Sequence, residues 1–384
     1  MKKLMPKTAL WVLLAMMTFA AQGLTLGAAR TDLYLPLLKN KRVGMIVNQT
    51  SMVNQMHLVD YLLAKKVDIR KVMAPEHGFR GDAGAGETIA DGHDEKTGLP
   101  ILSLYGKTKK PTPAMLQDID ILIFDIQDVG ARFYTYISTL HLVMEAAAEQ
   151  GIPLIVLDRP NPNGRFVDGP VREEAFASFV GMDPIPLLHG MTMAELAQMI
   201  KGENWISHAA ALSLHVVKMA NYRKDQLYSL PVPPSPNLPN DQAIALYPSL
   251  CLFEGTTVSV GRGTPYPFQV LGHDKVKLGE FQFSPQSLPN SAPYPKLEGK
   301  VLFGMDLRHA SLEGFDLSLL LSTYEQFKRA DESFIDRPAF FDKLAGTDQL
   351  RRDLEAGKSE ADIRQQWQPA LTRFKQQRRP YLLY

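Results

Sequence analysis

An acid and an imidazole stand side by side in the stretch VMAPEHGFRGDAGAGE, residues 72–87, where Glu76 and His77 precede a glycine-rich loop. The apolar residues before Glu76 are typical of a buried strand. A carboxyl group at the end of such a strand, shielded from water by other loops, has its pKa raised and can act as a general acid. The glycines would let the backbone approach a ligand closely. An ion pair of Glu76 with Arg80 or Arg132 that only braces the loops is the alternative.

Asp125 and Asp128 follow another apolar run, Ile121–Phe124, which is also typical of a strand. Two carboxyl groups on either side of a bond are the usual apparatus of glycoside hydrolysis. Either aspartate is therefore a candidate for the base, the nucleophile or the orienting group beside Glu76. Capping of the turn after the strand is the alternative role for one of them, and the sequence does not distinguish the two.

Arg132, Tyr134 and Tyr136 alternate shortly after these acids. In an extended segment they would share one face, which would suit a planar anion and a sugar ring. A packed loop with its tyrosine hydroxyl groups on backbone is the alternative. Further along, Arg262 lies between two glycines, and a guanidinium on such a flexible backbone could grip a carboxylate. Glu254 is either a second catalytic acid or the partner of Arg262, and we favour the partner.

Amide side chains mark further loops. Asn48 follows the apolar run at residues 43–47, and the proline-stiffened turn DRPNPNG follows the run at residues 153–157. Its asparagines could bind sugar hydroxyl groups or could only close Asx turns. Together with the residues above, the candidate substrate-binding set includes Asn48, His77, Arg159, Asn161, Asn163 and Asn237.

These residues need a scaffold that brings strand ends together. Apolar runs alternate with helical patterns: the predicted strands are 43–47, 69–74, 101–105, 121–124 and 153–157, and the predicted helices are 56–65, 138–150 and 192–200. Such strands indicate a parallel sheet covered on both faces, with ligands beyond the carboxyl ends of the strands. We therefore predict an α/β fold whose Rossmann-like domain spans residues 30–265.

The composition changes after Pro265, where a smaller α+β subdomain is predicted over residues 266–384. Its Pro/Ser-rich segment at 284–295 indicates a loop, and helical patterns follow at 312–329, 338–344 and 360–376. At the other end, residues 1–23 combine lysines with an apolar run that is too short to span a bilayer comfortably. They predict a signal peptide, hence a periplasmic or secreted protein without stable membrane insertion; a retained anchor is the alternative.

Composition and missing motifs argue against several classes of function. The formal net charge of +1 gives no electrostatic case for nucleic acid as a partner. The single cysteine, Cys251, excludes an intramolecular disulfide and a cysteine-based zinc cluster, and the histidines show no metal-binding spacing. No Walker A motif, no GxGxxG after a strand and no GxSxG elbow occurs. We expect neither a metal nor a cofactor.

At these motifs the chain resembles a known family. APEHGFRGDAGAGE, TGLPILSLYG, IFDIQDVGARFYTYISTL, LDRPNPNG, PSPN and LFEGTTVSVGRGT occur in this order and resemble the exo-β-N-acetylmuramidases of the NamZ type, long labelled a domain of unknown function. The resemblance covers nearly the whole chain after Lys41. It implies a Rossmann-like domain, a smaller C-terminal subdomain and an active site between them.

The resemblance also implies cleavage of N-acetylmuramic acid from the non-reducing ends of peptidoglycan fragments, with Glu76 as the leading catalytic acid. Muramic acid carries a lactyl carboxylate that glucosamine lacks, and Arg132 or Arg262 could bind it. A non-catalytic protein that binds cell-wall sugars is one alternative. A peptidoglycan esterase or amidase is another, although Ser235 has no evident activating partner in the sequence.

Overall fold

The computed structural model describes residues 23–80 and 91–384. The predicted signal peptide, apart from its last residue, and the part of the glycine-rich loop that follows Arg80 lie outside these described residues. Within the described ranges, no helix is long and apolar enough to cross a membrane.

A seven-stranded sheet forms the centre of the first half of the chain, in the order β11-β8-β7-β1-β4-β6-β5. Neighbouring strands are parallel, except that β5 runs antiparallel to β6. The strand order reverses between β1 and β7, which is the doubly wound pattern of Rossmann-like domains and confirms the predicted α/β fold. The strands are β1 (Arg42–Val47), β4 (Asp68–Ala74), β5 (Gly92–His93), β6 (Pro100–Ser103), β7 (Ile121–Asp125), β8 (Leu154–Leu157) and β11 (Leu214–Val217).

Helices cover both faces of this sheet. Successive residues of a strand point to opposite faces, so a strand that is apolar throughout needs packing partners on both. Met45 of β1 packs in one core cluster with α2 (Leu58–Ala64), and Ile46 packs in the other with α4 (Tyr136–Gln150) and α5 (Met193–Gly202). Short helices α1 (Thr31–Tyr34) and α3 (Pro113–Leu116) complete the layers. The central strands are therefore apolar on both faces, which is why they were recognisable in the sequence.

Local signals explain where the helices begin and end. Gly151, with φ at +65°, ends α4 in the left-handed conformation, and Thr192 forms a capping box with Glu195 at the start of α5. The helix predicted from Met56 begins only at Leu58. Met56–His57 is strand β3, which pairs with β2 (Met52–Val53) before His57 caps α2.

The C-terminal part is built around a small antiparallel sheet and several helices. The sheet has the order β12-β14-β13, with β12 (Val270–His273), β13 (Phe281–Phe283) and β14 (Leu302–Asp306). The helices are α6 (Asp241–Leu250), α7 (Ser318–Arg329), α8 (Pro338–Ala345), α9 (Gln349–Glu355) and α10 (Glu360–Gln377). The helix predicted from residue 312 starts late because Gly314 adopts φ of +71° and the Asp316 side chain accepts the Ser318 backbone N–H.

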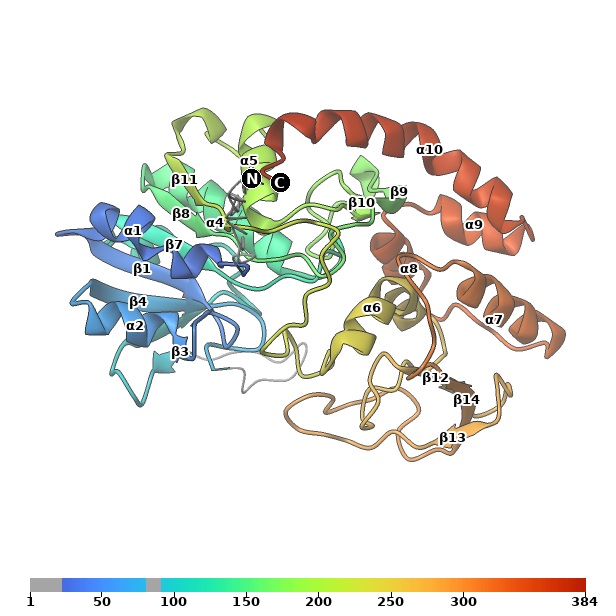
Figure 1. The fold of residues 1–384 in the computed structure, drawn as a ribbon. Helices are drawn as coiled ribbons and strands as arrows, with labels where there is room; N and C mark the ends of the chain where they lie inside the picture. The colour runs from blue at the N-terminus through green and yellow to red at the C-terminus, as the bar shows by residue number, and fades with distance from the viewer. Residues whose placement is uncertain (1–22, 81–90) are drawn as a thin grey trace, which may run out of the picture.

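The last helix returns to the Rossmann-like domain, as the red ribbon in Figure 1 shows. Arg364 of α10 pairs with Asp168 at 2.7 Å, at the start of the hairpin formed by β9 (Asp168–Val171) and β10 (Pro186–Leu188). The hydroxyl group of Tyr384 donates to Asp158 at 2.7 Å, directly after β8. The two parts are thus joined along the sequence and again by the C-terminus. The predicted division at residues 265/266 stays a prediction.

Candidate active site

A cavity of about 740 Å³ lies between the carboxyl ends of the central strands and the C-terminal part. Loops after β4, β6 and β7 line it from one side. Helix α6, the segment that follows it, the segment at residues 291–296 and helix α8 line it from the other side. Of the predicted site residues, it brings together Glu76, His77, Tyr134, Tyr136, Asn237, Glu254 and Arg262.

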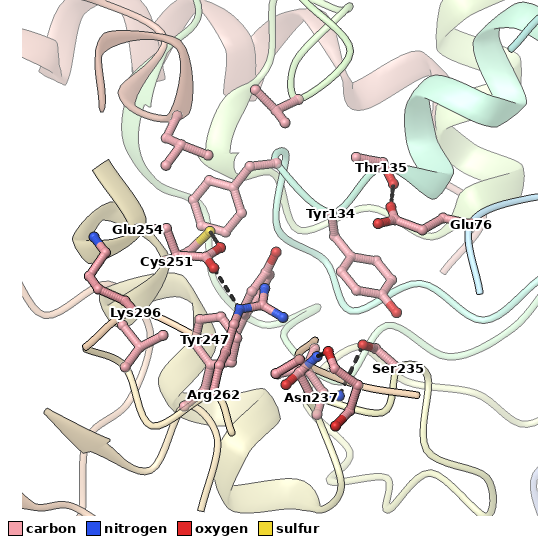
Figure 2. Close-up of a pocket in the computed structure, with 18 of the residues that line it drawn as sticks. Glu76, Tyr134, Thr135, Ser235, Asn237, Tyr247, Cys251, Glu254, Arg262 and Lys296 are labelled. Carbon is pink, nitrogen blue, oxygen red and sulfur yellow. Dashed lines mark hydrogen bonds and ion pairs between the residues drawn. The ribbon is translucent and has the colours of Figure 1, made fainter. Parts of the chain in front are cut away.

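Glu76 reaches this cavity from the loop that follows β4 (Figure 2). The Thr135 hydroxyl group donates to Oε2 of Glu76 at 2.8 Å, and the Tyr136 hydroxyl group donates to the Glu76 carbonyl oxygen at 3.2 Å. Burial, followed by the nearby Glu76 carboxylate, raises the pKa of Tyr105. His77 is buried beside Glu76 and adopts φ of +71°. The strand end thus presents a carboxyl group among hydroxyl donors.

Arg80 and Arg132, which the sequence offered as ion-pair partners of Glu76, have other contacts. Arg80 pairs with Asp94 at 2.8 Å, and Arg132 is only 1% exposed. The Arg132 guanidinium donates to backbone carbonyl oxygens of Pro170, Ile185 and Leu344 at 2.8–2.9 Å. These contacts link the β9–β10 hairpin to α8.

The expectation of an extended segment with Arg132, Tyr134 and Tyr136 on one face is wrong. The chain turns after Ala131 and enters α4 at Tyr136, so Arg132 points into the protein while both tyrosines line the cavity. The hydroxyl group of Tyr134 donates to the Pro234 carbonyl oxygen at 2.7 Å, and its ring meets that of Tyr136 edge-on at 5.0 Å. The tyrosines therefore form a fixed aromatic wall.

Glu254 and Arg262 form an ion pair on the side of the cavity opposite Glu76, as Figure 2 shows. Nε of Arg262 donates to Oε1 of Glu254 at 2.6 Å, in agreement with the favoured interpretation of Glu254 as a partner. Burial opposes the charge of Arg262, but the Glu254 carboxylate outweighs it and raises the Arg262 pKa. The ring of Phe268 lies 4.9 Å from the guanidinium carbon. Asn237 also lines the cavity and donates to the Ser291 carbonyl oxygen at 2.7 Å.

Asp125 and Arg159 do not line the cavity. They form a buried two-point ion pair: Nε donates to Oδ1 at 2.6 Å, and a terminal guanidinium nitrogen donates to Oδ2 at 2.8 Å. Asp125 is 0% exposed and Arg159 3% exposed. The pair joins the ends of β7 and β8. Because both carboxylate oxygens contact the guanidinium, the geometry supports a role for Asp125 in bracing the strand ends.

The asparagines at the strand ends also turn inward rather than into the cavity. Oδ1 of Asn48 accepts from the backbone and hydroxyl groups of Thr50. Oδ1 of Asn161 accepts the Asn163 backbone N–H at 2.8 Å, and its amide nitrogen donates to the Met191 carbonyl oxygen. Asn163 donates to the Val129 carbonyl oxygen. The Asn161 side chain therefore closes an Asx turn, which was one of its two predicted roles, whereas the Asn163 side chain joins segments that are distant in the sequence.

Asp128 lies behind the cavity wall, 5% exposed. Its Oδ2 accepts the Gly130 backbone N–H at 2.6 Å, whereas Oδ1 is buried without a hydrogen-bond partner among the residues the structure describes. Burial raises the pKa of Asp128 to about 7. Capping of the turn after β7 is thus the role that the geometry supports for this aspartate.

Replacing Asp128 by Asn should remove one source of pH-dependent stability. A carboxyl group with a folded pKa of about 7 binds more protons in the folded than in the unfolded chain between about pH 4 and 7. Its contribution is present at low pH and is lost as the pH rises through 7, with a slope of up to about 1.4 kcal/mol per pH unit. The free energy of unfolding, measured with denaturant, should be larger for the variant relative to wild type at pH 8 than at pH 5. A difference in unfolding free energy between the variant and wild type that is the same at pH 5 and pH 8 would contradict this.

Comparisons with known proteins bear on this geometry. Family models for exo-beta-N-acetylmuramidase NamZ match the chain, the N-terminal model over residues 43–242 and the C-terminal model over residues 245–384. The chain belongs to the NamZ exo-β-N-acetylmuramidase family. A Bacillus subtilis (strain 168) protein named peptidoglycan beta-N-acetylmuramidase NamZ is 41% identical over 373 residues, 91% of this chain and 89% of the relative.

Two solved structures have a similar architecture. Two DUF1343 family proteins from Bacteroides fragilis are 45% and 31% identical to this chain, with TM-scores of 0.85 and 0.81. In both comparisons the match covers 94% of this chain and 99% of the solved one. The resemblance stated from the sequence motifs is thus confirmed, and the family is one of glycosidases.

Several cavity residues of this NamZ family member were not singled out in the sequence. Thr135 donates a hydrogen bond to Glu76, and Tyr105 lies close to the same carboxylate. Tyr247 and Lys296 line the part of the cavity that contains Arg262. Thr135 lies between Tyr134 and Tyr136 in the sequence, and this position is the signal that points to it. Lys296 directly follows the Pro/Ser-rich segment at residues 284–295, and no motif in the sequence marks it. Among the described residues, no group of histidine, cysteine, aspartate and glutamate side chains could hold a metal ion.

Proposed function

We propose that this chain hydrolyses the glycosidic bond that links a terminal, non-reducing N-acetylmuramic acid to the rest of a peptidoglycan fragment. The observation that carries the proposal is that Glu76 and Arg262 share one cavity between the two parts of the chain. Glu76 supplies a carboxyl group for proton transfer. Arg262 supplies a cation for the lactyl carboxylate. Membership in the NamZ family supports the same reaction.

In the proposed reaction Glu76 gives its proton to the glycosidic oxygen while the bond from that oxygen to C1 of muramic acid breaks. Water adds its oxygen to C1, and its released proton restores the Glu76 carboxyl group over the cycle. Thr135 and Tyr136 hold Glu76 in place. Tyr134, Tyr136 and Tyr247 offer ring faces and edges against which a sugar can pack.

None of the three acids considered beside Glu76 is given the role of second catalytic group in this proposal. Asp125 and Asp128 do not line the cavity, so neither is given the role of base or nucleophile in this proposal. Glu254 lines it, but Oε1 of Glu254 is held by Arg262. We assign Glu254 to positioning of the guanidinium. Residues 81–90, which include Asp82 and Glu87, lie outside the described residues.

The location of the enzyme is part of the proposal. The lysine-rich and apolar start of the chain supports export, which would bring the enzyme to peptidoglycan in the periplasm or outside the cell. Expression of the full chain followed by cell fractionation and N-terminal sequencing tests this. A cytoplasmic protein that retains its first residues would contradict it.

Product analysis tests the reaction. The protein without residues 1–23 is incubated with two disaccharides, one with muramic acid and one with glucosamine at the non-reducing end, and products are identified by mass spectrometry. Free N-acetylmuramic acid is expected from the first disaccharide and no cleavage from the second. Binding without cleavage would support the sugar-binding alternative. Release of acetate or peptide from decorated fragments would support the esterase or amidase alternative.

A further inference from the structure

Lys296 lines the cavity from the segment between β13 and β14. Its Nζ atom is buried and has no hydrogen-bond partner among the residues that the structure describes. Its ion-pair partner Asp336 lies 4.0 Å away, at the limit of such a contact. Burial is the largest influence on Lys296 and lowers its pKa, and the distant Asp336 carboxylate does not offset this.

An ammonium group in this position destabilises the free protein. It has lost water and has not gained the hydrogen bonds that normally replace water in a protein interior. A side chain needed only for packing would be Met or Leu, which fill similar space without a charge. Local violations of this kind are expected at sites where a ligand completes the contacts. Lys296 therefore has the features of a group that awaits an anion.

A second donor with the same property lies in the same cavity. Nη1 of Arg262 is buried and also has no hydrogen-bond partner within the described part of the chain. Figure 2 shows Lys296, Glu254 and Arg262 on one side of the view, and Glu76 with Thr135 on the other. Glu254 balances the charge of Arg262 at 2.6 Å, so Lys296 is the cation of this group that lacks a close counter-charge.

We infer that Lys296, together with Nη1 of Arg262, binds the lactyl carboxylate of N-acetylmuramic acid and so selects this sugar over N-acetylglucosamine. The inference rests on the proposed function. The lactyl group is carried on C3 and the bond that breaks is on C1. Holding the carboxylate on the Lys296 side therefore turns C1 towards the side with Glu76. N-acetylglucosamine has a neutral hydroxyl group at C3 and would leave the buried ammonium without an anion.

The test measures binding of monosaccharides, which the enzyme does not cleave. Calorimetry compares N-acetylmuramic acid, its neutral carboxamide and N-acetylglucosamine on the wild type, Lys296→Met and Lys296→Arg. The wild type should prefer the carboxylate over the carboxamide by roughly thirtyfold to a few thousandfold, the range for truncating one partner of a buried charge pair. Lys296→Met should lose most of this preference with little change for the carboxamide. Lys296→Arg should keep most of it.

Lys300→Met is the matched control because Lys300 is an exposed lysine of the same segment that pairs with Asp274 at 2.6 Å. It should keep the wild-type preference. Equal weakening of all three sugars by Lys296→Met, or an unchanged preference, would overturn the inference. If that variant fails to fold, a wild type without preference for the carboxylate would overturn it equally. A wild type that prefers the carboxylate but releases no muramic acid would refute the proposed function and leave the binding site standing.

Discussion

Replacement of Glu76 by Gln is expected to reduce the release of N-acetylmuramic acid by roughly two to four orders of magnitude, the usual contribution of a general acid–base group. Glutamine has nearly the same size and can still accept the Thr135 hydroxyl hydrogen bond made by Oε2. It has no proton to deliver to the glycosidic oxygen. The loss should therefore appear in kcat, while binding of free N-acetylmuramic acid should change little.

The measurement is kcat and KM on the muramic-acid-terminated disaccharide, with thermal unfolding to show that the variant is folded. Glu298→Gln serves as the control because Glu298 is an exposed carboxylate in the chain segment that also carries Lys296. It should leave kcat unchanged. Undiminished release by Glu76→Gln would keep the enzyme but move proton transfer to another group, with Glu254 as the next candidate because it also lines the cavity.

Removing one member of the Asp125–Arg159 pair should have the largest effect on stability. Arg159→Met leaves a carboxylate that is 0% exposed without its two guanidinium contacts of 2.6 and 2.8 Å. An uncompensated buried charge of this kind costs about 3–5 kcal/mol. The free energy of unfolding, measured in urea, should fall by that amount. Asp125→Asn should also destabilise the protein, since the Arg159 charge then lies buried without a counter-charge.

The same variants decide whether Asp125 takes part in the chemistry. The structural role predicts that the folded fraction of Asp125→Asn releases N-acetylmuramic acid with a kcat close to that of wild type. Asp225→Asn is the matched control, because Asp225 forms its ion pair with Arg223 at the surface and should show no measurable change in stability. A stable Asp125→Asn variant with a collapsed kcat would return Asp125 to the catalytic residues.

Much of the scaffold could be predicted from local patterns. Strands β1, β7 and β8 and the last three residues of β4 are buried on both faces, so their apolar runs are visible in the sequence. Glu76 follows β4 directly, and its place at a carboxyl end followed from that run. Helix α7 starts at Ser318 and not at residue 312 as predicted, because Gly314 and Asp316 form a turn within a segment of helical composition.

The candidate site was harder to predict because some polar side chains after the strands line the cavity and others are buried inside the protein. Tyr134 and Arg132 are two residues apart, yet the tyrosine lines the cavity and the guanidinium is buried on backbone carbonyl oxygens. The turn into α4 decides this, and its direction depends on packing against the β9–β10 hairpin and α8. One of the Arg132 contacts, to Leu344, spans 212 residues of sequence.

By itself the sequence determined the α/β class, the NamZ family and a carboxyl group at the end of β4, because these depend on apolar runs and contiguous motifs. Only the tertiary structure decided which charges meet. Asp125 pairs with Arg159, Glu254 pairs with Arg262, and Lys296 lines the cavity from a position just after the Pro/Ser-rich segment. Burial and pairing are properties of neighbours in space, and most of those neighbours are distant along the chain. The role of each polar residue therefore became readable only once the chain was folded.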